Sequence, residues 1–102
     1  MQPPGQNSSG QQPQADAESI LQFPCEIAVK AFGSADGDDF DMLVFSLVCR
    51  HVPNLGEAAL RSRKSAGGRY VAVTVTIQAQ SRAQMDAIYR DLSAEERVVM
   101  AL

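Results

Sequence analysis

The chain has 102 residues, with 12 acidic and 9 basic side chains, a formal net charge of −3 and 45% apolar residues. This length suits one small domain with a thin core and excludes a large two-lobed enzyme. No apolar run approaches the roughly 20 residues of a membrane-spanning helix, and the mildly acidic charge argues against a dedicated nucleic-acid-binding protein.

The N-terminal segment differs in composition from the rest of the chain. Its first 17 residues contain five Gln and three Pro, so they offer almost no apolar surface to bury. The hydrophobic gain cannot offset an ordering cost of about 1–2 kcal/mol per residue. We therefore expect a disordered tail over residues 1–18 and one folded domain over 19–102. The segment also lacks the basic and apolar regions of a secretory signal, which predicts a cytoplasmic protein.

The first half of the domain predicts a strand and a helix. Residues Cys25–Phe32 alternate between apolar and other side chains, a period typical of a half-buried strand. Gly33–Gly37 is expected to be a loop. Apolar residues then recur at helical spacing over Phe40–Val48, and Arg50 and His51 are expected in the last turn of this helix, just before a proline that ends it. Four aspartates near its start suit the positive end of the helix dipole. They are Asp36, Asp38, Asp39 and Asp41.

The second half predicts two strands, a helix and a last strand. Glu57–Ser65 is a weaker strand, and Ala66–Gly68 is a turn signal because glycine permits positive φ. Tyr70–Ala79 is the clearest strand of the chain, and its strongly apolar face predicts a central place in the sheet. Ser81–Gln84 reads as a capping box that opens a helix. Val98–Leu102 is a short apolar strand at the end.

This order of elements predicts the architecture. Strand, helix, strand, strand, helix, strand with right-handed crossovers gives a ferredoxin-like βαββαβ fold, an α+β two-layer sandwich. Its four-stranded antiparallel sheet carries both helices on one face and leaves the other face open. The covered face is expected to hold Ile27, Val29, Val73, Val75 and Ile77, and the open face Glu26, Lys30, Phe32, Thr74 and Thr76.

Catalytic and metal-binding candidates are few. One His and two Cys are too few ligands for a structural zinc site, and the aspartate spacing departs from a calcium loop. No serine nucleophile motif is present. Cys25 lies in the inward register and is expected to be an inert thiol. We therefore expect no metal, no cofactor and no enzyme activity. The alternative is a small thiol-dependent enzyme or redox protein that uses Cys49 and His51.

The turn between the second and third strands is the strongest binding candidate. Between Arg61 and Tyr70 the chain carries four of its nine basic residues and no acid. Glycine backbone N–H groups beside Arg and Lys can hold an anion. The competing interpretation is a solvated hairpin whose charges protect an edge strand from aggregation. The candidate binding residues are Arg61, Arg63, Lys64, Gly67, Gly68, Arg69 and Tyr70.

The open sheet face is a second candidate surface. In RNA-binding modules of this architecture such a face carries stacked aromatic residues. Here the central strand offers Thr74 and Thr76 instead, which argues against RNA. The face remains suited to docking another domain or a second copy of the chain, and the sequence leaves the oligomeric state open.

Several short motifs occur in one order from about Leu21 to the C-terminus. They are Phe23-Pro24, Val29-Lys30, Phe32-Gly33, His51 with Pro53, Arg63-Lys64-Ser65, Gly68-x-Tyr70, Val73-Thr74-Val75-Thr76-Ile77-x-Ala79, Gln84-Met85-Asp86-x-Ile88-Tyr89-x-x-Leu92 and Val99-Met100-Ala101-Leu102. Together they resemble the YbeD-like family of small bacterial proteins. Ile27 departs from the pattern, because relatives often carry an aromatic residue there.

The resemblance implies a ferredoxin-like fold similar to the ACT-type regulatory domains of metabolic enzymes. A regulatory part in lipoate metabolism has been proposed for the family, and it has no agreed catalytic residues to transfer. Likeness to ACT domains does not imply amino-acid binding. We expect a non-enzymatic regulatory or interaction module that binds a protein partner or a small anionic metabolite through the basic hairpin and the adjacent sheet surface.

Overall fold

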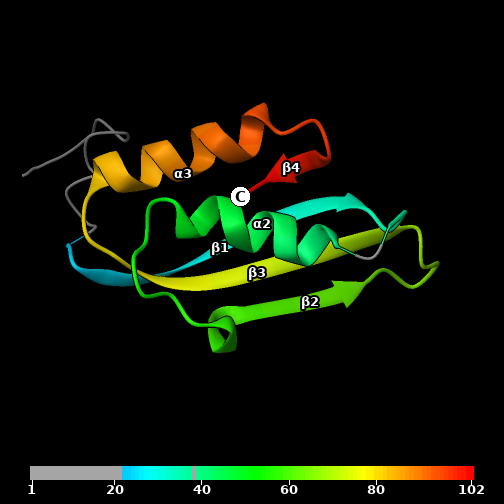
Figure 1. The fold of residues 1–102 in the computed structure, drawn as a ribbon, viewed down its shortest axis with the longest axis horizontal. Coiled ribbons are helices and arrows are strands. Elements are labelled where there is room, and N and C mark those ends of the chain that lie inside the picture. Colours follow the sequence, from blue (N-terminus) through cyan, green and yellow to red (C-terminus); the bar gives the residue numbers. More distant parts are fainter. Residues whose placement is uncertain (1–21, 38) are drawn as a thin grey trace, which may run out of the picture.

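One antiparallel sheet of four strands carries two helices in the computed structural model, which describes residues 22–37 and 39–102 (Figure 1). The predicted tail over 1–18 lies outside the described residues. The strand order is β2-β3-β1-β4, which confirms the ferredoxin-like α+β sandwich. The elements are β1 (Cys25–Ser34), α2 (Phe40–Cys49), a 3₁₀ turn η1 (Glu57–Ala59), β2 (Leu60–Lys64), β3 (Tyr70–Ala79), α3 (Arg82–Ala94) and β4 (Val98–Ala101).

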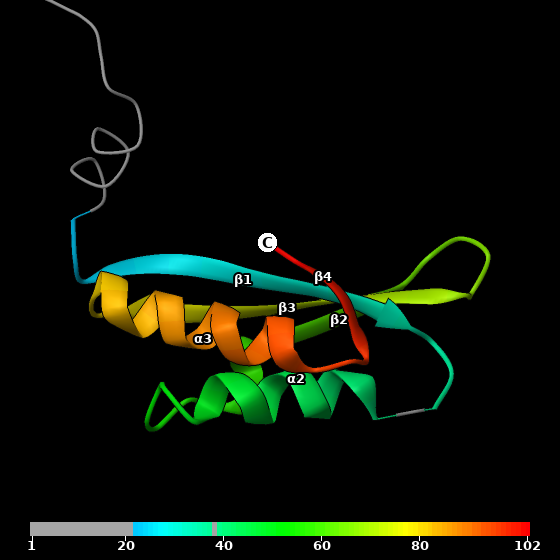
Figure 2. The ribbon, with the colours of Figure 1, turned by 90° about the horizontal axis from the view of Figure 1, so that it is seen from above.

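Both helices lie on the same side of the sheet, as the view along the layers shows (Figure 2). Strands β1 and β3 pair over their whole length, from Cys25 opposite Ala79 to Ser34 opposite Tyr70. Because side chains alternate along each strand, one face of this pair is apolar and buried under the helices. No helix of residues 22–37 and 39–102 covers the other face.

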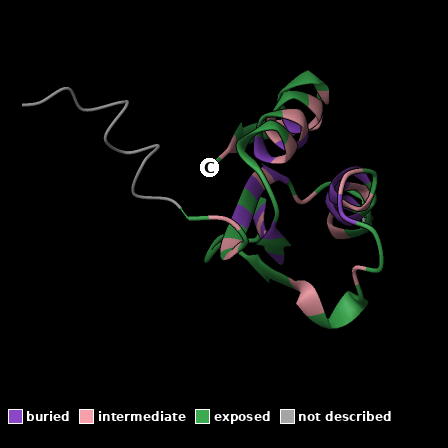
Figure 3. Ribbon diagram, turned by 90° about the vertical axis from the view of Figure 1, so that its left-hand side faces the viewer, coloured by how far each residue is buried: buried purple, intermediate pink, exposed green. Residues whose placement is uncertain are grey.

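The core fills the space between the sheet and the helices (Figure 3). Val44 and Val48 of α2 and Ile88 and Leu92 of α3 are fully buried in it. The predicted covered face is confirmed, with Ile27 half-buried at the edge of the core. From the sheet, the core takes Val29, Ala31, Val71, Val73, Val75, Ile77 and Ala79.

Strand β1 is two residues longer than predicted. Gly33 and Ser34 were expected in a loop, but they pair with Val71 and Tyr70 of β3. The register toward β4 shifts between Phe32 and Gly33, which is a β-bulge. The glycine is tolerated in the strand because it packs closely against other parts of the fold, a role that glycine serves in strands.

The first helix is shorter than predicted. Helix α2 ends at Cys49, and Arg50 forms its C-cap, so neither Arg50 nor His51 lies in the last helical turn. The His51 N–H donates to the Val48 carbonyl at 3.0 Å, a three-residue closure that tightens the chain beyond the helix.

The predicted strand before the hairpin begins late. The residues of η1 form a 3₁₀ turn, in which the Ala59 N–H donates to the Gly56 carbonyl at 3.0 Å, and pairing with β3 starts at Leu60.

No helix among residues 22–37 and 39–102 is long and apolar enough to cross a membrane.

The predicted cap of α3 is present in altered form. Ser81 Oγ accepts the Gln84 N–H at 3.1 Å, as expected for an N-cap. The Gln84 side chain accepts the N–H of Gln80 at 2.6 Å, one residue earlier than a capping box requires.

Candidate functional site

Register places three cationic side chains on the open face of the sheet. Lys30 of β1 pairs with Thr74 of β3, and Thr74 pairs with Arg61 of β2. Arg63 lies two residues beyond Arg61 on the same strand and therefore on the same face. All three cations are exposed. Pairing across β3 thus brings together charges that are about 30 residues apart in the sequence.

These cations surround a shallow hollow of about 400 Å³. Ala72 and Thr74 belong to the central strand β3, so Lys30 and Phe32 flank them on one side and Arg61 and Arg63 on the other. We call this hollow the basic groove. Its lining residues are Lys30, Phe32, Arg61, Ser62, Arg63, Ala72 and Thr74.

A second hollow of about 140 Å³ continues the basic groove toward the hairpin turn. The two hollows share Phe32, Arg63 and Ala72, and the second adds Tyr70. The Tyr70 side chain is exposed, so an aromatic ring stands at this end of the basic groove.

The basic groove carries positive charge without internal compensation. Lys30, Arg61 and Arg63 take part in no ion pair within the part of the chain that the structure describes. The acid of the open face is Glu26, which pairs with Gln78 four residues before Lys30, about 13 Å along the strand. An anion in the basic groove would therefore meet three cations, and the Glu26 side chain on the same face stands about 13 Å away along β1.

The structure separates the seven predicted binding residues. Arg61 and Arg63 lie on the open face, whereas Lys64 has the opposite register and lines a hollow of about 240 Å³ beside Asp41 of α2. Lys64 lines the second hollow together with Arg63, but it does not line the basic groove. Sequence reasoning grouped them because they are neighbours in the chain.

The turn residues of the hairpin serve its own geometry. Gly68 adopts a positive φ of 73°, and its N–H donates to the Ser65 carbonyl at 2.9 Å. That N–H is used inside the turn and is not free to bind an anion. Gly67 lies beside it in the same turn, and Arg69 lines a separate hollow with Ser34.

Lys30 and Phe32 complete the basic groove, although the sequence-based list of binding residues omitted them. Both were predicted on the open face, and the predicted topology already put their strand beside β3. Combining face and strand order would have found them, because β1 and β2 flank the same central strand.

Cys49 and His51, the residues of the alternative thiol-enzyme hypothesis, are held in packing and hydrogen-bond contacts within the fold. Cys49 is half-buried against the core, and burial raises the pKa of its thiol. His51 Nε2 lies 2.7 Å from Asp91 Oδ2 of α3, and the Gln84 side chain donates to the His51 carbonyl at 2.8 Å. These contacts join the end of α2 to α3.

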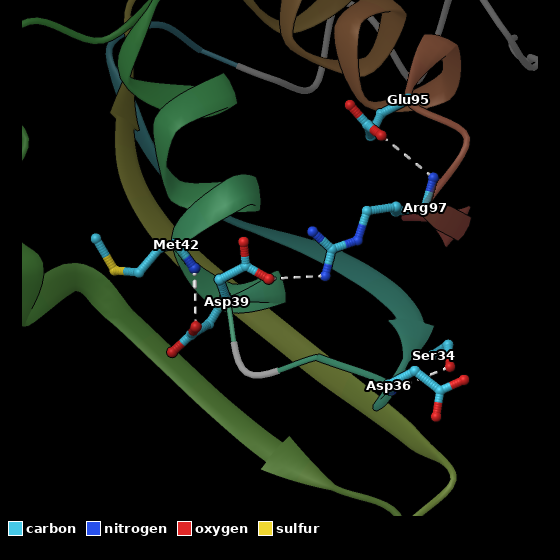
Figure 4. A network of polar contacts seen from close by, with 7 residues as sticks. Ser34, Asp36, Asp39, Met42, Glu95 and Arg97 are labelled. Atoms are coloured by element: carbon cyan, nitrogen blue, oxygen red, sulfur yellow. Dashed lines mark hydrogen bonds and ion pairs between the residues drawn. The ribbon is translucent and has the colours of Figure 1, made fainter.

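Two of the predicted aspartates, Asp39 and Asp41, make side-chain contacts at the start of α2, where Asp41 accepts the Met42 N–H at 2.8 Å (Figure 4). Asp39 is the N-cap residue but makes no side-chain cap hydrogen bond. Instead it accepts from Arg97 Nη2 at 3.0 Å, and the Arg97 guanidinium lies over the Phe40 ring. This hydrogen bond and the cationic charge of Arg97 lower the pKa of Asp39. Asp38 lies outside the described residues. Among the described residues, no group of three or more His, Cys, Asp or Glu side chains is placed to hold a metal ion.

Comparison with known proteins places the chain in a family. Residues 18–102 match the family described as a protein of unknown function, DUF493. The UPF0250 protein NE1487 of Nitrosomonas europaea is 35% identical over 85 residues, which cover 83% of this chain and 97% of that relative. The chain belongs to the DUF493 family. A UPF0250 protein of Azotobacter vinelandii is 42% identical over 83 residues, covering 80% of this chain and 89% of the relative.

Membership of DUF493 confirms the YbeD-like resemblance, and a solved structure agrees with the fold. The solution structure of HP0495 from H. pylori superposes with a TM-score of 0.63 at 13% identity and covers 92% of this chain and 98% of that one. The names of these DUF493 relatives state no activity, so the link to lipoate metabolism stays an expectation.

Proposed function

We propose that this DUF493 chain is a non-enzymatic regulatory or interaction module whose basic groove binds an anionic group of a partner. The partner is an acidic protein or a small anionic metabolite. The observation that supports this most directly is the convergence of Lys30, Arg61 and Arg63, without ion-pair partners among the described residues, around a hollow of about 400 Å³.

The chemistry of the basic groove favours carboxylate or phosphate. Arginine presents a planar fork of donors that matches these groups and binds them with charge-assisted hydrogen bonds. Arg61 and Arg63 come from the same face of one strand, and Lys30 reaches the same hollow from across β3. Thr74 lies between them and adds a hydroxyl that can donate or accept.

The thiol-enzyme alternative has weaker support. A catalytic cysteine needs an accessible thiolate, which a raised pKa opposes. Cys49 is half-buried with a raised pKa, and His51 is engaged by Asp91. We also propose a cytoplasmic location for the module.

Titration with defined anions tests the proposal. Citrate and inorganic tripolyphosphate are added to ¹⁵N-labelled protein at low salt, and amide shifts are followed. We expect saturable shifts at Lys30, Arg61, Arg63 and Thr74. The double variant Arg61→Gln/Arg63→Gln is expected to weaken binding by about tenfold, because two charge-assisted contacts are removed.

The control is Arg90→Gln, which makes the same Arg→Gln exchange once, at an exposed position on α3. It is expected to leave both titrations unchanged. Equal binding by the double variant and the wild type, or shifts confined to the helices, would overturn the proposed function.

A further inference from the structure

The open face continues beyond the basic groove into an apolar strip along β4. Met100 pairs with Phe32, and its side chain is 51% exposed. Leu102 is 59% exposed. The Lys30 N–H donates to the Leu102 carbonyl at 3.0 Å, and the Leu102 N–H donates to the Lys30 carbonyl at 2.8 Å. Tyr89 of α3 also donates to the Leu102 carbonyl at 2.6 Å, so the end of the chain is held in place. We call Phe32, Met100 and Leu102 the apolar strip.

The open face is therefore divided across its width. Its β2 side carries Arg61 and Arg63, and its β4 side carries Met100 and Leu102, with Lys30 and Phe32 of β1 between them. We propose that the partner of this face is a protein that docks an acidic amphipathic α-helix along β1 and β3. This inference rests on the proposed function and names its partner class.

The width of the face argues for a helix. From β4 to β2 the sheet spans three strand spacings, about 14 Å. A helix with its side chains is about 10–12 Å across, so one helix over β1 and β3 reaches both flanks. A small anion in the basic groove would leave Met100 and Leu102 of the apolar strip uncovered.

Backbone hydrogen bonding argues in the same direction. An extended peptide lying flat on the face of a sheet finds no backbone partners there, and its N–H and C=O groups would lose water without compensation. A helix satisfies these groups internally. Small side chains in the middle of the face, Ala28 and Ala72, leave room for its close approach.

The spacing of the arginines matches acidic residues on a helix. Arg61 and Arg63 are two residues apart on one strand, about 6.7 Å. Acidic residues at positions i and i+4 of a helix are separated by about 6 Å along its axis. Charge complementarity thus selects a helix with acids on one flank and large apolar residues on the other.

A designed peptide of about 16 residues is the probe. It carries Leu at i, i+4 and i+8 and Glu at i+1, i+5 and i+9, and a shuffled peptide has the same composition without this periodicity. Binding is measured by fluorescence anisotropy at low salt and at about 0.15 M salt. We expect the patterned peptide to bind about tenfold more tightly than the shuffled one.

Matched variants separate the two halves of the face. Arg61→Gln/Arg63→Gln is expected to weaken peptide binding about tenfold, and Met100→Thr about fivefold through lost apolar contact. The controls Arg90→Gln on α3 and Met42→Thr on α2 remove the same groups from the helical layer and should change nothing. Met42 is a fair control because its side chain is also exposed, at 44%.

Three outcomes would overturn the helix inference. The shuffled peptide binds as well as the patterned one, or Met100→Thr binds like the wild type, or sedimentation shows that a second copy occupies the face. In the first two cases citrate titration still reports on the basic groove, so the proposed function can stand alone. In the third case the second copy would also cover the basic groove, so the titration is run below the concentration at which the copies associate. Loss of both anion and peptide dependence on the arginines would overturn both proposals.

Discussion

The Phe40 ring of α2 packs directly against the backbone of Gly33 in β1. A Cβ at position 33 would overlap this ring and would lie 2.7 Å from the Arg97 carbonyl oxygen. Since Phe40 is buried and fixed by the core, it cannot move aside cheaply. We expect Gly33→Ala to lower the free energy of unfolding by about 1–3 kcal/mol, measured by urea denaturation.

Gly67 and Gly68 serve as comparison positions for the Gly33→Ala variant. A Cβ on Gly67 would meet no atom within 4 Å, so Gly67→Ala should change stability by less than about 0.5 kcal/mol. Gly68 has equally open surroundings but a positive φ, so its Ala variant should cost about 1–2 kcal/mol through backbone strain alone. Equal stability of the Gly33→Ala and Gly67→Ala variants would show that position 33 is not crowded.

Periodicity explains how much of the fold was predictable. Two strands and two helices have clear repeats, so their faces and the strand order followed from general rules. Gly33 shows why the end of β1 did not: glycine usually signals a turn, and its role here depends on a ring from another element. Likewise, α2 ends at Cys49, and His51 beyond it contacts Asp91 and Gln84 of α3, contacts that the local sequence does not display.

The candidate site was predictable only in part. Arg61 and Arg63 were identified because basic residues cluster in the sequence, and Lys64 was grouped with them for the same reason. Alternation along the strand sends Lys64 to the other side of the sheet. Lys30 joins the arginines through pairing across β3, a relationship between distant segments that no local motif carries.

The reaction rate of the Cys49 thiol tests the alternative hypothesis of a thiol-dependent enzyme. Because burial raises its pKa, little thiolate is present near neutral pH. In a Cys25→Ser background, we expect Cys49 to react with Ellman's reagent more slowly than free cysteine at about pH 7.5, and faster in urea. A folded-state reaction as fast as that of free cysteine would restore the redox hypothesis.

The Asp39–Arg97 pair predicts a titration shift. Arg97 lowers the pKa of Asp39 through a hydrogen bond and through its charge. We expect Arg97→Gln to raise the Asp39 pKa toward its ordinary value of 3.8, measured by NMR titration of the carboxyl carbon. Arg90→Gln, which removes a distant charge, should not move it. An unchanged Asp39 pKa in Arg97→Gln would mean that the pair does not form in solution.

The contact between His51 and Asp91 predicts how stability depends on acid. The hydrogen bond from His51 is the main cause that lowers the pKa of Asp91, with the charges of His51 and Arg50 adding to it. A carboxyl group whose pKa is lower in the folded state stabilises the fold above its unfolded pKa, near 3.8, and this contribution is lost as pH falls through the folded value. Asp91→Asn should therefore be less stable than the wild type at about pH 6, and the difference should shrink as the pH falls below 3.8. Urea denaturation across this range measures it, with His51→Gln and the double variant completing a cycle. A difference between Asp91→Asn and the wild type that stays constant with pH would show that Asp91 titrates alike in the folded and unfolded chain.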